Sequence, residues 1–160
     1  MGQLWQVLGG FLFAISVAAC VGSSTLSREA DAPGDPVIGL LNKGITHLNL
    51  SISALSRRID EVQQASPGTD PLLQEMQALD LSGWQLHRQQ WVLQRDHLVF
   101  GRDMLAKAGT NQDQNHRIMD QWHQHWKQYV TALEELRLQR HNLENKHLDV
   151  EARLIERGLR

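Results

Sequence analysis

The chain has 160 residues, 41% of them hydrophobic, and a formal net charge of −2. This length is enough for one domain, and the nearly balanced charge argues against nucleic-acid binding, which needs Lys and Arg concentrated on one face. The only cysteine, Cys20, excludes a disulfide within the chain, because a disulfide needs a second thiol.

The N-terminal segment carries no charged side chain as far as residue 22, and its apolar run, LWQVLGGFLFAISVAA, covers residues 4–19. The run is short and interrupted by two glycines, which is not typical of a regular membrane-spanning helix. It ends in small residues that lead directly to the cysteine, in the order Val17-Ala18-Ala19-Cys20. This motif resembles the lipobox of bacterial lipoprotein signal peptides, although the usual Lys or Arg before the apolar run is missing.

The resemblance implies that residues 1–19 are a signal peptide and that Cys20 is acylated and becomes the new N-terminus. Residues 20–35 are small, polar and turn-forming, and we expect them to be a flexible, lipid-anchored tether. Val21 follows the cysteine in place of Asp, which in a Gram-negative host implies sorting to the outer membrane, facing the periplasm. The alternative is an uncleaved anchor ending near Val21 that holds the protein in the inner membrane.

The segment 36–65 is predicted to be the first helix, because its apolar residues alternate in steps of three and four. Asp35-Pro36 suits a helix start, and Ser66-Pro67-Gly68 ends the helix. The apolar positions are Ile38, Leu41, Ile45, Leu48, Ile52, Leu55, Ile59 and Val62.

The segment 71–108 is predicted to be the second helix, opened by Asp70-Pro71 in the same way. One side carries Leu72, Met76, Leu79, Gly83, Leu86, Gln90, Leu93, His97, Phe100 and Met104. A neighbouring stripe of Trp84, Trp91, Leu98 and Leu105 widens this apolar face, as a helix with two partners requires.

The segment 112–158 is predicted to be the third helix. Its seam is Met119, Trp122, Trp126, Tyr129, Leu133, Leu136, Arg140, Leu143, His147, Val150 and Leu154. Short turns make neighbouring helices antiparallel, so residues 36–160 are predicted to form an all-α, elongated antiparallel three-helix bundle or coiled coil. Folding the last two helices about residue 110 sets Arg140 beside Gly83, and we expect Arg140 and His147 to fix the helix register.

The helix lengths indicate where a partner would bind. If the first two helices fold about residue 68, Ile38 lies level with His97, and about twelve residues on each arm of the second hairpin lack a third helix. An exposed apolar patch usually marks an interaction site. The predicted partner-binding set is Leu98, Phe100, Met104, Leu105, Ile118, Met119 and Trp122.

A metal site is a further hypothesis, because His116, Asp120 and His123 are spaced to lie along one helix face. Imidazole and carboxylate groups suit Zn, Cu or Ni. The alternative interpretation is a solvated polar face opposite the tryptophans Trp122 and Trp126.

Catalytic motifs are not found: the sequence has no Gly-x-Ser-x-Gly elbow and no glycine-rich phosphate loop. We expect a non-enzyme without a cofactor or a small-molecule substrate. The leading hypothesis is a membrane-anchored envelope lipoprotein that acts as a helical scaffold or adaptor, contacting another envelope protein or a copy of itself. The alternatives are a periplasmic metal- or stress-responsive binding protein using the histidine-rich third helix, and an accessory, pilotin-like lipoprotein of a secretion or pilus system.

Overall fold

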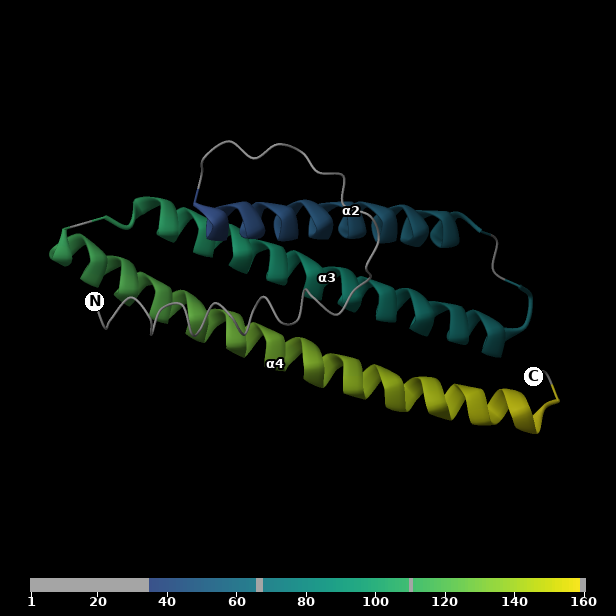
Figure 1. Ribbon diagram of the computed structural model, residues 1–160. Coiled ribbons are helices and arrows are strands. Elements are labelled where there is room, and N and C mark those ends of the chain that lie inside the picture. The colour runs from purple at the N-terminus through teal and green to yellow at the C-terminus, as the bar shows by residue number, and fades with distance from the viewer. Residues whose placement is uncertain (1–34, 66–67, 110, 159–160) are drawn as a thin grey trace. The chain divides into compact units, whose positions relative to one another are not determined.

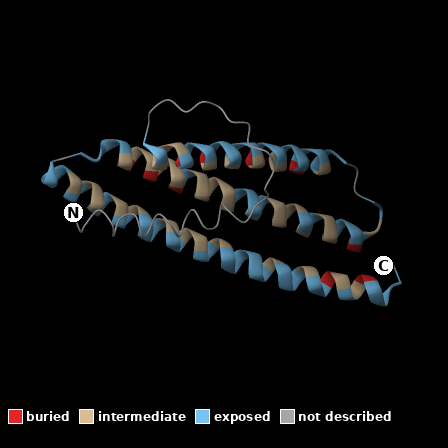
Figure 2. Ribbon diagram, viewed as in Figure 1, coloured by how far each residue is buried: buried red, intermediate tan, exposed pale blue. Residues whose placement is uncertain are grey.

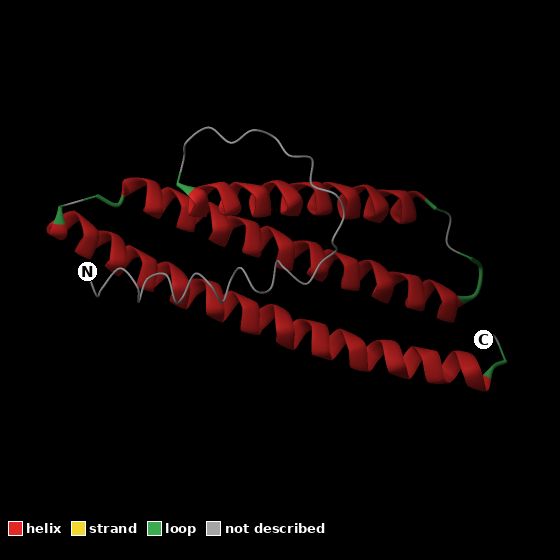
Figure 3. Ribbon diagram, viewed as in Figure 1, coloured by secondary structure: helices red, strands yellow, loops and turns green. Residues whose placement is uncertain are grey.

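Three helices make up most of the described chain in the computed structural model, which describes residues 35–65, 68–109 and 111–158. They are α2 (Pro36–Gln64), α3 (Pro71–Lys107) and α4 (Gln112–Glu156), and these residues contain no strand (Figures 1 and 3). The predicted all-α, three-helix fold is confirmed. The proposed signal peptide, Cys20 and the tether before Asp35 lie outside the described residues.

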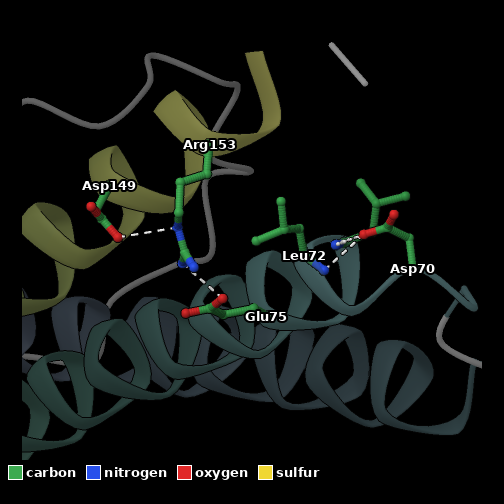
Figure 4. Close-up of polar contacts among 6 residues, drawn as sticks. Asp70, Leu72, Glu75, Asp149 and Arg153 are labelled. Carbon is green, nitrogen blue, oxygen red and sulfur yellow. Dashed lines mark hydrogen bonds and ion pairs between the residues drawn. The ribbon is translucent and has the colours of Figure 1, made fainter. Parts of the chain in front are cut away.

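The helix starts follow from local chemistry. Asp70 caps α3: its Oδ1 accepts hydrogen bonds from the backbone N–H groups of Leu72, at 2.8 Å, and Leu73, at 3.4 Å (Figure 4). Pro71 occupies the first turn, where a missing N–H costs nothing. Asn111 caps α4 in the same way, through a hydrogen bond from the N–H of Gln114 at 3.2 Å.

Helix α3 lies between the other two and packs against both, whereas α2 and α4 have at most marginal contact within the described residues (Figure 1). The buried apolar side chains come mainly from α2 and from the two ends of the α3–α4 pair (Figure 2). They are Leu41, Ile45, Ile52, Ile59, Leu72, Met104, Val150 and Leu154. None of the three described helices is apolar over a stretch long enough to cross a bilayer.

The α2–α3 register differs from the expected one. Arg102 Nη1 lies 3.5 Å from Asn42 Oδ1, and Arg88 Nε donates to Ser56 Oγ at 2.6 Å. From one contact to the other, the residue number falls along α3 and rises along α2. The midpoint of each pair is residue 72, not residue 68. Ile38 is therefore level with about residue 106, and α2 covers α3 almost to its end.

The α3–α4 register is also displaced from the expected one. His147 Nε2 lies 3.1 Å from Asp80 Oδ1, and a Cβ on Gly83 would lie 3.5 Å from Leu143 Cδ2. The residue beside Gly83 is thus Leu143, and the prediction of Arg140 at this place is wrong. Arg140 is exposed and pairs along its own helix with Glu144, with Nε and Oε1 3.5 Å apart.

Candidate functional site

The most unusual buried residue is His97, near the C-terminal end of α3. Only 3% of its surface is exposed, and it is the one polar side chain in the described part of the chain that is classed as buried. Its Nδ1 is buried and makes no hydrogen bond within this part of the structure. A buried polar atom without a partner costs free energy, so a native structure that keeps one needs an explanation.

Aromatic rings from α4 enclose His97. The ring of Tyr129 stacks on it with centroids 4.0 Å apart and planes 10° from parallel, and His125 lies parallel at 5.2 Å. Phe100 of α3 stacks on His125 at 3.9 Å. Two tryptophans complete the group, which we call the histidine cluster: Trp122 at 5.1 Å and Trp126 at 5.5 Å from the His97 ring.

The cluster holds its imidazoles in the neutral form. Burial and, as the smaller cause, the charge of a protonated His125 together lower the pKa of His97 from 6.5 to about 4. Burial also lowers the pKa of His125, an effect that the carboxylate of Asp96 partly opposes. Burial raises the pKa of Tyr129. Near neutral pH the cluster is therefore an uncharged aromatic core that acid can charge.

The sequence contained part of the signal for this cluster. His97, Trp122, Trp126 and Tyr129 all fall on the predicted seams, but His125 does not, and seam spacing alone does not show which residues face each other. The missing information was the α3–α4 register, which brings His97 level with Tyr129.

The predicted partner-binding tip is not an exposed patch. Met104 is buried, the other six members of the set are half-buried, and none is among the large apolar side chains that are exposed. The reason is the α2–α3 register: a Cβ on Gly44 would lie only 3.1 Å from Leu98 Cδ1, so α2 covers this part of α3. Phe100 and Trp122 belong to the histidine cluster. The inference of an uncovered two-helix tip is therefore corrected.

The exposed apolar residues lie instead mainly on α4. This helix has 45 residues, yet only Val150 and Leu154 are buried. Four of its exposed apolar residues share one face within about 40°, because each residue advances an α-helix by about 100°. We call this face the outer stripe, and its apolar members are Trp126, Val130, Leu148 and Ile155.

Leu138 is also exposed but lies about 80° around α4 from Leu148. Among the described helices only α3 packs substantially against α4, and Val130, Leu148 and Ile155 lie away from that contact. Trp126 belongs to both features, since 40% of its surface is exposed while its ring contacts His97. These four side chains are separated along the helix but share one face, which makes that face a candidate contact surface.

The predicted metal ligands His116, Asp120 and His123 are all exposed. Among the described residues no group of three or more His, Cys, Asp and Glu side chains could hold a metal ion. The three side chains start from one face of α4, as their spacing predicts. Among the described residues, no further ligand from another helix joins them to form a metal site. The interpretation as a solvated polar face fits their exposure.

Ion pairs join α3 and α4 at the end remote from the cluster. Arg153 Nη2 lies 2.8 Å from Glu75 Oε2, and its Nε lies 3.3 Å from Asp149 Oδ2 on its own helix (Figure 4). These partly exposed pairs contribute little energy individually. Together with the pair formed by His147 and Asp80, they favour the observed alignment of the two helices.

A hollow of about 450 Å³ lies between α3 and α4. Its lining combines apolar side chains such as Val92 and Leu136 with the charged Asp96 and Glu135, and includes no Ser, Cys, Thr or His. This lining therefore offers no hydroxyl, thiol or imidazole side chain.

Comparisons of the chain with protein families, with curated proteins and with solved structures give no match.

Proposed function

We propose that this protein is a lipid-anchored bacterial envelope protein that acts as a helical scaffold or adaptor, by contact and not by catalysis. The anchor part of the proposal comes from the lipobox-like motif Val17-Ala18-Ala19-Cys20. Cys20 would carry the lipid, residues 20–35 would be the tether, and the outer membrane facing the periplasm would be the location.

The observation that supports the contact part is the outer stripe of α4. Leu148 is 63% exposed. A partner that covers large apolar side chains of this kind stabilises the complex by about 25 cal/mol per Å² of apolar surface removed from water. Among the described helices α4 packs substantially on α3 alone, and these helices leave its stripe-bearing face uncovered. Helix-on-helix docking through apolar residues that share one helix face is a common recognition mode.

The anchor is tested with Cys20→Ser in the full chain. The expected result is an unprocessed precursor in the inner membrane that no longer takes up a fatty-acid analogue. Normal processing and labelling of the variant would contradict the lipoprotein proposal and favour an uncleaved anchor.

The contact surface is tested by affinity capture from the native envelope with Leu148→Glu and Ile155→Glu. The matched control is Leu138→Glu, because Leu138 has the same exposed fraction as Leu148, 63%, but lies off the stripe. We expect both stripe variants to lose partners that the control retains. Equal capture by all three variants would contradict the use of this stripe.

A further inference from the structure

We propose that the outer stripe of α4 pairs in antiparallel orientation with the same stripe of a second copy of this chain, which rests on the proposed use of the stripe as a contact surface. The two chains would form a two-fold symmetric dimer joined through α4.

The order of residues along the stripe is symmetric in part. Trp126 and Val130 make one apolar end, Leu148 and Ile155 make the other, and Arg137 and Glu144 lie between them on the same face. Arg137 follows Trp126 by as many residues as separate Glu144 from Ile155. A two-fold axis between residues 140 and 141 therefore exchanges Trp126 with Ile155 and Arg137 with Glu144, whereas Val130 and Leu148 exchange with the half-buried Glu151 and Leu133.

Antiparallel pairing about this axis matches most of these side chains by type, the exception being Val130, which lies level with Glu151 of the second copy. Trp126 lies level with Ile155 of the second copy, and Leu133 lies level with Leu148 of the second copy. Arg137 meets Glu144 of the second copy, and symmetry forms this contact twice. A two-fold interface requires one self-complementary patch, which the stripe provides.

The charges of Arg137 and Glu144 disfavour three competing alignments of the two α4 helices. Parallel pairing sets Arg137 beside Arg137 of the second copy and Glu144 beside its own counterpart. Sliding the antiparallel pair by seven residues in one direction opposes the two Arg137 side chains, and in the other direction opposes the two Glu144 side chains. Charged and polar residues in a helix pair set partner and orientation, so Arg137 and Glu144 favour the centred antiparallel dimer.

The central charges are available for such contacts. Arg137 and Glu144 are exposed, and the ion pairs they make along α4 are long: 3.7 Å from Arg137 Nη1 to Glu134 Oε1 and 3.5 Å from Arg140 Nε to Glu144 Oε1. Exposed pairs of this length hold side chains weakly, so the side chains can reorient toward a second copy.

The experiment measures the mass of the full chain in nanodiscs or detergent by light scattering, over a concentration series. Four charge variants are compared with the wild type: Arg137→Glu, Glu144→Arg, the double variant, and Lys146→Glu. Lys146 is the control, because it is exposed and lies about 200° around α4 from Glu144. Each stripe reversal turns two attractive contacts into two repulsive ones.

We expect a wild-type dimer, a dissociation constant raised about tenfold or more in each single stripe variant, recovery in the double variant, and no change in Lys146→Glu. A monomeric wild type, or a double variant no better than the singles, would overturn the inference. If the chain is monomeric but its stripe variants still lose another envelope protein in affinity capture, the dimer is wrong and the proposed function stands. If the dimer forms but Cys20→Ser is processed and labelled normally, the anchor fails and the dimer stands.

Discussion

His97 of α3 and Tyr129 of α4 stack face to face, with ring centroids 4.0 Å apart. The contact places an imidazole with an unpartnered Nδ1 inside the α3–α4 interface. An apolar residue would fill this space without the cost of an unpartnered polar atom. The consequence is an interface whose stability depends on the protonation of His97 and, beside it, of His125.

Acid should destabilise the helical domain through His97. Its folded pKa of about 4 lies below the unfolded value near 6.5, so the unfolded chain binds a proton first as pH falls. Stability is full above pH 6.5 and is lost between pH 6.5 and 4, by up to about 3 kcal/mol. His125 contributes in the same direction, because burial lowers its pKa, although Asp96 opposes the effect. On α2, the titratable side chains near the level of His97 are Lys43 and His47, both exposed.

Urea unfolding followed by circular dichroism at pH 7 and pH 4.5 measures this loss. His97→Phe keeps a stacking ring and removes the titration, so its pH dependence should be flatter than that of the wild type. The control is His116→Phe, which changes an exposed histidine. A pH dependence that is the same in wild type and His97→Phe would show that His97 is not the titrating group.

Leu154 and Leu148 lie on the same helix, but truncation should destabilise the protein at Leu154 and have little effect at Leu148. Leu154 is 2% exposed in the core cluster with Leu72 and Val150, whereas Leu148 is 63% exposed. Leu154→Ala should lower the free energy of unfolding by about 2–5 kcal/mol, because it removes buried contacts and leaves a cavity. Leu148→Ala should change it by less than about 0.5 kcal/mol. A large loss in Leu148→Ala under monomeric conditions would show that this face is covered.

Gly44 and Gly39 test the observed α2–α3 register. A Cβ at Gly44 would lie 3.1 Å from Leu98 Cδ1, whereas a Cβ at Gly39 would meet nothing within 4 Å. Gly44→Leu should push the helices apart and cost about 1–3 kcal/mol. Gly39→Leu should be neutral or stabilising, because leucine is the better helix former. Equal thermal stability of the two variants would argue against this alignment of α2 on α3.

The sequence was sufficient to predict the helices but not their alignment. Proline and cap residues lie at the helix starts, and the predicted ends differ from the observed ones by one or two residues. The alignment depends on how far each connection advances along the bundle, and apolar spacing does not encode this advance. An offset of about four residues in the midpoint of the α2–α3 pair was enough to cover the predicted tip around Leu98 and Met104.

The outer stripe could not be predicted from the spacing of the apolar residues either. The third predicted seam included Trp126, which is half in the cluster and half exposed, but it omitted Val130, Leu148 and Ile155. These residues occur at wider intervals and are recognisable as one face only after the α3-facing side of α4 is known. The sequence does not distinguish His97 from the other seam residues of its helix. Most of its ring partners lie on α4, so they are recognisable only once the α3–α4 alignment is known.

The most direct test of the account is site-specific photo-crosslinking in the native membrane. A benzophenone amino acid replaces Leu148 on the outer stripe of the full chain, and a second variant carries it at Lys146, about 200° away on α4. We predict a specific crosslinked product at position 148, with the mass of two copies of the chain and a crosslink near Leu133 of the second copy, and no such product at position 146. Equal labelling at the two positions, or none at position 148, would contradict the conclusion that this face of α4 is a contact surface.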